Sequence, residues 1–140
     1  VMNENRILTS LPSNVNILKF YNYFETRNHL WMIFEFCPGG DLYSLLNADK
    51  VSLNLVQGQL NEQTARLFGI EILNGLGHLF SNEIIYCDLK PSTILLNEYS
   101  KLKLSDFGVA WKTSDFMNPS KDSQSPSKQG SPFYMAPELF

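Results

Sequence analysis

The first forty residues carry one helical and two extended hydrophobic patterns. Apolar residues recur at roughly helical spacing over Val1–Leu11, before Pro12, which predicts a helix that ends there. Two runs rich in aromatic and branched residues follow, Ile17–Phe24 and His29–Phe36. Because only residues 25–28 separate these runs, the pattern predicts an antiparallel hairpin.

The middle of the chain predicts a short helix and a long one. Cys37-Pro38-Gly39-Gly40 ends the second strand, and Asp41 can then cap a short helix through Leu46. We expect Asn47–Leu60 to be a loop or a short insertion. Asn61 is a suitable N-cap for a longer helix. Its apolar positions, spaced by three or four residues, are Ala65, Phe68, Ile72, Leu76 and Leu79, and we expect this stripe to face a core.

The last third of the chain predicts short strands followed by a loop. Ile84–Tyr86, Ile94–Leu96 and Lys101–Leu104 are strand candidates, separated by residues that favour turns, and they could form small hairpins. From Lys112 to Pro132 the composition changes to six serines and three prolines in 21 residues. This composition is typical of a mobile loop.

Composition and charge exclude several classes of protein. With 44% hydrophobic, 13% aromatic and 18% charged residues, the chain is too apolar to be disordered throughout. A net charge of −3 without a basic stripe argues against a nucleic-acid partner. The longest apolar run, Leu30–Phe34, is too short to span a bilayer, and Glu4 and Arg6 stand where a signal peptide would be apolar, so we expect no membrane partner.

The two cysteines bear on metal binding and on location. Cys37 and Cys87 lie far apart, without a CxxC pair or clustered histidines, so neither a zinc site nor a disulfide framework is indicated. A reducing setting fits best, and we expect the protein to be cytoplasmic.

Three short motifs occur in a fixed order along the chain. They are Tyr86-Cys87-Asp88-Leu89-Lys90-Pro91, then Asp106-Phe107-Gly108, then Ala136-Pro137-Glu138. In this order the sequence resembles the eukaryotic protein kinases. The resemblance implies an α+β, two-lobed kinase fold that is only partly covered. Residues 1–37 would be the remainder of the small lobe with its hinge, and residues 38–140 the first part of the large lobe.

The resemblance also implies roles for the charged residues of the first two motifs. Asp88 would be the catalytic aspartate, which accepts or orients the proton of the substrate hydroxyl. Lys90 would place a cation beside the phosphoryl group that is transferred. Asp106 would hold Mg²⁺ on the phosphates of ATP, since this hard cation prefers carboxylate oxygen.

A nucleotide site is implied by position within the kinase pattern. Phe34 would be the gatekeeper behind the adenine pocket, and the backbone of Glu35 and Cys37 would form the hinge that binds adenine. Asp41 would lie near the ribose. Leu95 would pack under the adenine ring; the plain alternative is a core residue, and the two readings are compatible.

Further positions would regulate the kinase. Glu4 resembles the glutamate of the regulatory helix that pairs with a strand lysine, but an exposed helix charge is nearly as good a reading. Ser127 sits where an activating phosphate often lies, although serines are also common in unmodified linkers. Ser131 would hydrogen-bond near the catalytic aspartate. The other regulatory positions are Phe107 and Gly108 of the metal-binding loop and Glu138 at the end of the activation segment, and the stack that links the lobes would be Leu8, Phe20, Tyr86 and Phe107.

Two residues depart from the kinase pattern. Thr93 replaces an asparagine that binds the second Mg²⁺, and its shorter hydroxyl should bind that metal more weakly. Cys87 replaces the arginine before the catalytic aspartate, so an activating phosphate would lose its usual bidentate partner. The chain also shows no glycine-rich loop and no lysine before Glu4. We therefore expect a fragment, cut before Val1 and after Phe140, that is inactive alone.

Three hypotheses about function remain open at this point. The Asp88-Leu89-Lys90-Pro91-Ser92 sequence resembles serine/threonine kinases, which transfer the γ-phosphoryl group of ATP to a protein substrate. Finer resemblance to the Fused, unc-51-like and RUNKEL group also allows a pseudokinase scaffold with cytoskeletal partners, in microtubule or cytokinesis roles. The third hypothesis is a truncated product without independent function.

Overall fold

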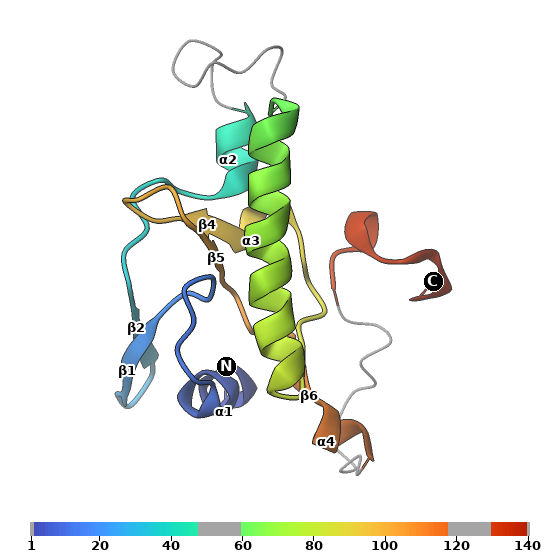
Figure 1. The fold of residues 1–140 in the computed structure, drawn as a ribbon. Coiled ribbons are helices and arrows are strands. Elements are labelled where there is room, and N and C mark those ends of the chain that lie inside the picture. The colour runs from blue at the N-terminus through green and yellow to red at the C-terminus, as the bar shows by residue number, and fades with distance from the viewer. Residues whose placement is uncertain (1, 48–59, 118–129, 140) are drawn as a thin grey trace.

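The computed structural model of the protein describes residues 2–47, 60–117 and 130–139. Helices and short strands are mixed along the chain, as the predicted α+β class requires (Figure 1). The helices are α1 (Met2–Ser10), α2 (Leu42–Asn47), α3 (Glu62–Ser81) and α4 (Thr113–Met117), and the strands are β1 (Phe20–Glu25), β2 (Leu30–Phe34), β3 (Ile84–Ile85), β4 (Ile94–Leu96), β5 (Leu102–Leu104) and β6 (Trp111–Lys112). Short 3-10 turns cover Pro91–Thr93, Pro132–Tyr134 and Pro137–Leu139.

The strands form three antiparallel pairs. β1 pairs with β2 and β4 pairs with β5, which confirms the first predicted hairpin and one of the smaller ones. β3 pairs instead with β6, far along the chain, through Ile84 opposite Lys112 and Ile85 opposite Trp111. Figure 1 shows β6 at the lower end of α3, next to α4.

The predicted loop over Lys112–Pro132 is wrong at both of its ends. Lys112 belongs to β6, the helix α4 begins directly after it, and Pro132 opens a 3-10 turn. Hydrogen bonding explains the first difference, because the Thr113 N–H donates to the Glu83 carbonyl at 2.8 Å. Residues 118–129 of this segment, Ser127 among them, lie outside the described residues, as does most of the predicted loop Asn47–Leu60.

The first predicted strand is shorter than expected because its beginning has another partner. Ile17 forms a parallel bridge with Leu104, and the Leu18 N–H donates to the Leu104 carbonyl at 2.9 Å. Residues 16–19 therefore join the β1–β2 hairpin to β5. Strand β1 begins only at Phe20.

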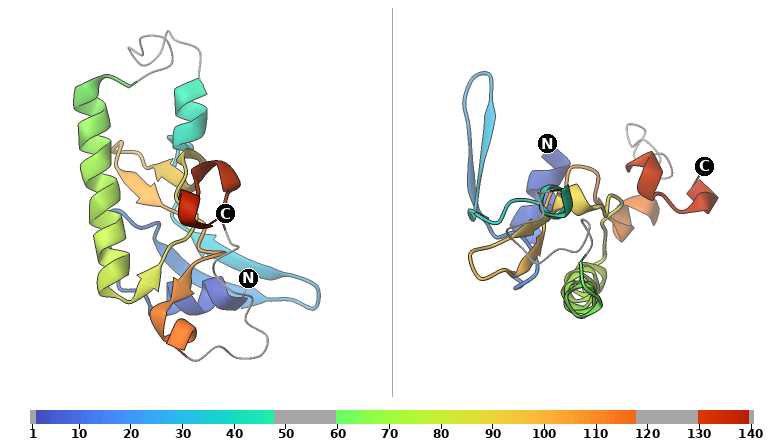
Figure 2. Two further views of the ribbon diagram at one scale, coloured as in Figure 1. Left: turned by 90° about the vertical axis from the view of Figure 1, so that its right-hand side faces the viewer. Right: turned by 90° about the horizontal axis from the view of Figure 1, so that it is seen from above.

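Helix α3 stands against the β4–β5 pair, as both views in Figure 2 show. The Asn61 side chain accepts a hydrogen bond from the Thr64 N–H at 2.8 Å, which confirms the predicted N-cap. Four residues of the predicted stripe, Phe68, Ile72, Leu76 and Leu79, belong to or pack against the core. Ala65 is exposed, so its place in the buried stripe was predicted wrongly.

One hydrophobic core connects these elements. Its largest fully buried side chains are Ile7 of α1, Leu79 of α3, Leu102 and Leu104 of β5, and Phe107 just beyond β5. Two of these five side chains belong to β5, and the other three come from three other segments of the chain. Strand β5 therefore lies at the centre of the core that the described residues form. In the described part of the chain, no helix is both long and apolar enough to cross a membrane.

Candidate phosphoryl-transfer site

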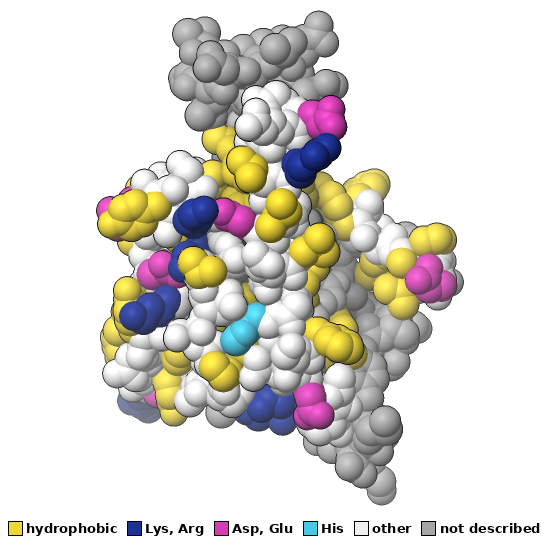
Figure 3. All heavy atoms as spheres, viewed as in Figure 1, with side chains coloured by type: hydrophobic (Ala, Val, Ile, Leu, Met, Phe, Trp, Pro, Cys, Tyr) yellow, Lys and Arg dark blue, Asp and Glu magenta, His cyan; other side chains and the backbone are white. Residues whose placement is uncertain are grey.

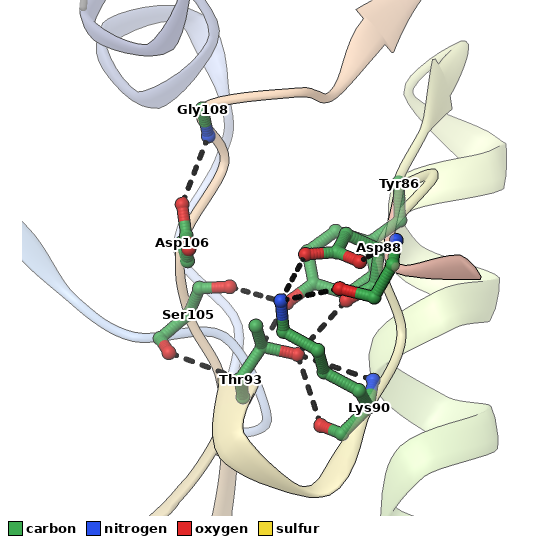
Figure 4. Close-up of polar contacts among 8 residues, drawn as sticks. Tyr86, Asp88, Lys90, Thr93, Ser105, Asp106 and Gly108 are labelled. Atoms are coloured by element: carbon green, nitrogen blue, oxygen red, sulfur yellow. Dashed lines mark hydrogen bonds and ion pairs between the residues drawn. The ribbon is translucent and has the colours of Figure 1, made fainter. Parts of the chain in front are cut away.

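A buried carboxylate lies at the centre of the loop between β3 and β4. Asp88 is 8% exposed, and its two oxygens have different partners. Oδ2 pairs with the Lys90 ammonium at 2.6 Å, and Oδ1 accepts the Ser131 N–H at 2.8 Å. Lys90 also donates to the Ser131 hydroxyl at 2.7 Å. Asp88 and Lys90 (Figure 4) thus form one hydrogen-bonded cluster with Ser131, which is more than forty residues further along the chain.

The environment of Asp88 favours its ionised form. Burial by itself raises the pKa of this carboxyl, but the hydrogen bonds from Lys90 and Ser131, together with the Lys90 charge, more than offset that effect. The pKa of Asp88 is therefore lowered from its ordinary value of 3.8. At neutral pH the group is a carboxylate, suited to orient a hydroxyl rather than to store a proton.

Thr93 is hydrogen-bonded to the same loop that carries Asp88 and Lys90. Its side chain is buried, and its hydroxyl lies 3.0 Å from the carbonyl oxygens of both Asp88 and Lys90. The Lys90 N–H donates to this hydroxyl at 3.3 Å. The hydroxyl is thus engaged within the loop, which favours a bracing role over the predicted role of metal ligand.

Asp106 presents a carboxylate at the end of β5. The residue is exposed, and its Oδ1 accepts only a long hydrogen bond, 3.3 Å, from the Gly108 N–H among the described residues (Figure 4). Its φ is 56°, in the left-handed region that non-glycine residues seldom occupy. Such strain is concentrated at functional sites, where the surrounding structure holds it.

Glu4 of α1 approaches this carboxylate. Burial, and then the negative charge of Asp106, raise the pKa of Glu4 above its ordinary value of 4.5. Glu4 is half-buried, so the reading of a simple exposed helix charge does not hold. Its position beside the metal-binding loop agrees with the predicted regulatory position, while the regulatory role itself stays a prediction.

The side chains predicted to link the two lobes as a hydrophobic stack lie in the core or pack against it. Leu8, Tyr86 and Phe107 are buried, and Phe20 packs against the same cluster. The rings of Tyr86 and Phe107 meet edge to face at 5.4 Å. The Tyr86 hydroxyl donates to the Ser105 carbonyl, and burial raises the pKa of this phenol. Phe107 is thereby fixed, and with it the backbone of Asp106.

The segment that follows the undescribed residues 118–129 returns to the catalytic loop. Gly130 has a φ of 125°, and a Cβ on it would lie 2.7 Å from the Cys87 carbonyl oxygen. Only glycine allows this approach, which brings Ser131 to Asp88. Cys87 itself has a φ of 68° and is partly buried, and burial raises the pKa of its thiol. Glu138, further on, is exposed.

The predicted hinge residues follow β2 directly. Phe34 is partly buried, with its ring 5.4 Å from that of Phe20. The Glu35 carbonyl and the Cys37 N–H have no hydrogen-bond partner among the described residues, as an adenine-binding edge requires. Asp41 caps α2 by accepting from the Ser44 N–H and hydroxyl, both at 2.8 Å. These bonds lower the pKa of Asp41.

Leu95 lies on β4 close to Asp41, with which it forms a β-bridge. It is only partly buried, unlike its neighbours Ile94 and Leu96. This exposure is what a residue with a ligand-facing side requires, and Leu95 is not among the described residues that form the core cluster or pack against it.

Comparison with known proteins decides the family. The family model described as the protein kinase domain matches residues 1–140, which is the whole chain. The chain belongs to the protein kinase family. This kinase chain therefore has a partial kinase-like fold, in agreement with the predicted fold class.

Serine/threonine kinases are prominent among the relatives of this kinase chain. It is 44% identical to the serine/threonine-protein kinase RUNKEL of Arabidopsis thaliana over 142 residues, which cover 100% of the chain and 9% of that protein. It is 38% identical to the serine/threonine-protein kinase ULK4 of Mus musculus, over 74% of the chain and 7% of that protein. The 3-phosphoinositide-dependent protein kinase B of Dictyostelium discoideum is 39% identical, over 99% of the chain and 14% of its own length. The chain thus spans only a small part of these relatives.

Two buried residues of the kinase site were missed at the level of sequence. Ser105 donates from its hydroxyl to the Thr93 carbonyl at 3.0 Å, and so joins β5 to the catalytic loop. Lys103 of β5 is buried although lysine usually is not. The adjacency of Ser105 to Asp106 was a usable signal, whereas nothing in the alternating Lys101–Leu104 pattern marks Lys103 as buried.

Proposed function

We propose that this chain carries the phosphoryl-transfer centre of a serine/threonine protein kinase, which moves the γ-phosphoryl group of ATP to a hydroxyl of a protein substrate. The observation that carries this proposal is the cluster of Asp88, Lys90 and Ser131. A buried carboxylate paired with an ammonium supplies one group that orients the substrate hydroxyl and one that stabilises developing phosphoryl charge.

The residues present fit ATP and Mg²⁺. ATP would supply the phosphoryl group, and Mg²⁺ would neutralise its phosphates. The exposed carboxylate of Asp106 suits Mg²⁺, which proteins usually bind through one or two carboxylates together with substrate phosphates. In the hinge, the Glu35 carbonyl and the Cys37 N–H, which have no hydrogen-bond partner in the part of the chain that the structure describes, offer an acceptor and a donor to adenine, and Leu95 is partly exposed.

A pseudokinase scaffold is the second candidate function. Two observations favour it, namely the engagement of the Thr93 hydroxyl within the catalytic loop and the presence of Cys87 where kinases usually have arginine. Under this proposal the chain would bind nucleotide weakly or not at all and act by holding other proteins, with cytoskeletal proteins as candidate partners. The two candidates differ in whether phosphate is transferred.

A phosphate-transfer assay on the longest natural protein that contains this sequence distinguishes the kinase from the pseudokinase scaffold. Wild-type protein should phosphorylate a generic protein substrate weakly and only with Mg²⁺. Asp106→Asn should abolish this transfer, because it removes the metal-binding charge. Glu98→Gln, a change of an exposed carboxylate outside the site, should leave the transfer unchanged. Equal transfer by the wild type and Asp106→Asn would support the scaffold instead.

A further inference from the structure

Lys103 is a buried positive charge in the strand that leads to Asp106. All three residues of β5 are buried, and the Lys103 side chain is only 9% exposed. Lys103 lies opposite Leu95 of β4 in the antiparallel register, so the two side chains share one face of the pair. Because an ammonium this deeply buried is costly unless it is paired, its partner matters.

The partner is Glu35, the first residue after β2. Its Oε1 lies 2.8 Å from the Lys103 ammonium, and its side chain is 17% exposed. The same oxygen accepts the Lys19 N–H at 2.6 Å, while the Glu35 N–H donates to the Lys19 carbonyl at 2.9 Å. Glu35 is therefore held by its backbone and by its side chain together.

The pair connects two parts of the site that the chain keeps far apart. Glu35 supplies the carbonyl proposed to bind adenine, and Lys103 stands three residues before Asp106. Residues 16–19 fill the space between them, since the Leu104 N–H donates to the Asn16 carbonyl at 2.8 Å. Cys37, the second hinge residue, follows Glu35 by two positions; burial and then the Glu35 charge raise the pKa of its thiol, while the Lys103 charge lowers it.

We infer that Lys103 is a positioning residue of the nucleotide site, whose ion pair with Glu35 fixes the adenine-binding hinge relative to the strand that carries Asp106. The inference rests on the proposed kinase function. Lys103 does not touch the nucleotide in this account. Loss of the Lys103 charge leaves the largely buried Glu35 carboxylate without a counter-ion in the hinge. Recognition of the adenine base should therefore be weakened most.

The inference is tested by measuring the binding of ATP and of GTP to the longest natural protein that contains this sequence. Lys103→Met keeps the length of the side chain and removes its charge. This variant should bind ATP at least roughly tenfold more weakly than the wild type, and its preference for ATP over GTP should fall. A residue that served folding alone would lower the melting temperature without changing the choice between the two bases.

Lys101→Met is the matched control. Lys101 is two residues away and pairs with Glu71 of α3 at the same distance, 2.8 Å, but its side chain is 53% exposed and its partner is not a hinge residue. Its loss should change neither affinity by more than about twofold. Equal base preference in Lys103→Met and Lys101→Met would overturn the inference and leave the proposed function standing. A wild type that binds neither nucleotide would overturn both.

A second variant covers the case in which Lys103→Met fails to fold. In Glu35→Gln combined with Lys103→Met, no buried charge is left without a partner, so the protein should fold. The tie between hinge and β5 is still missing, so the preference for ATP over GTP should remain reduced. A double variant with the base preference of the wild type would contradict the inference.

Discussion

Two residues of the site are held in a backbone conformation that is costly for them. Cys87 and Asp106 have φ values of 68° and 56°. For residues with a Cβ, the left-handed region costs about 1–2 kcal/mol each. Hydrogen bonds around Asp88 and the buried ring of Phe107 compensate for this cost by fixing the neighbouring residues. Glu83 and Ser100, outside the site, have similar φ values of 58° and 57°, so this conformation is not confined to the proposed chemistry.

Asp88 gives a pH-dependent contribution to stability. Its pKa is lowered from 3.8 in the folded chain, so its stabilising contribution is complete above that value and is lost as the pH falls through the folded pKa. Melting temperatures measured between pH 6 and pH 3 should therefore fall less steeply for Asp88→Asn than for the wild type. Glu98→Gln should follow the wild type, and parallel curves for all three proteins would contradict this account.

Thr93 gives a prediction about the second metal. Thr93→Asn supplies a longer amide oxygen at this position, and we expect it to raise Mg²⁺-dependent transfer severalfold at limiting Mg²⁺. Thr93→Val, which keeps the shape and removes the bracing hydroxyl, should lower transfer. Initial rates over a Mg²⁺ titration measure both. If Thr93→Asn and Thr93→Val were equally slow, side-chain volume rather than oxygen chemistry would control this position.

The site residues that belong to sequence motifs were predictable, whereas the buried Lys103 was not. Asp88, Lys90 and Asp106 stand in short ordered motifs, so their chemistry could be read without coordinates. Ser131 was also expected near Asp88, and its hydrogen bonds confirm this contact. Lys103 lies in an alternating pattern typical of an exposed strand face, and only the distant Glu35 explains its burial.

At the scale of elements, the long runs and the strand β3, within the predicted Ile84–Tyr86, were predictable, whereas the strand β6 and its pairing with β3 were not. The periodicity of α3 and the hairpin β1–β2 follow from local pattern and capping. The pairing of β3 with β6 depends on tertiary packing, because two residues carry no detectable period. Ala65 is exposed for a related reason, since a stripe at helical spacing does not tell how far along the helix its packing partner extends.

Glycines of α3 provide matched tests of its packing. A Cβ on Gly75 would lie 2.9 Å from Leu104 Cδ1 and 3.2 Å from the Asn16 carbonyl oxygen, whereas nothing lies within 4 Å of one on Gly69. Alanine gains up to about 1 kcal/mol of helix propensity at either position, but overpacking costs about 1–3 kcal/mol. Chemical unfolding should thus show Gly69→Ala to be stabilising and Gly75→Ala destabilising. Equal shifts would show that α3 does not pack closely on β5.

At the scale of the whole molecule, the core is one-sided. α3 buries one side against β5, while Leu67, Ile70 and Leu73 on its other side are 56%, 50% and 68% exposed. Figure 3 shows hydrophobic side chains along this helix on the face toward the viewer. Apolar surface left in contact with water gives no stabilisation on folding, so the described residues bury less than their composition allows.

The isolated 140 residues should therefore fold poorly. We expect a broad, weakly cooperative thermal transition and no measurable turnover of ATP, since the sequence has no glycine-rich loop or strand lysine ahead of Glu4. Calorimetry and an ATPase assay on the purified chain measure these properties. A sharp cooperative melt would contradict the first expectation, and Mg²⁺-dependent turnover the second.

The central claim, that Asp88 orients a protein hydroxyl for phosphoryl transfer, is tested most directly by Asp88→Asn in the longest natural product that contains this chain. The measurement is the rate of phosphate transfer to a protein substrate, with ATP binding measured on the same samples. We predict that ATP affinity stays within about twofold while transfer falls by at least roughly a hundredfold, in the range of general acid–base effects. Transfer by Asp88→Asn at the rate of the wild type would contradict the claim.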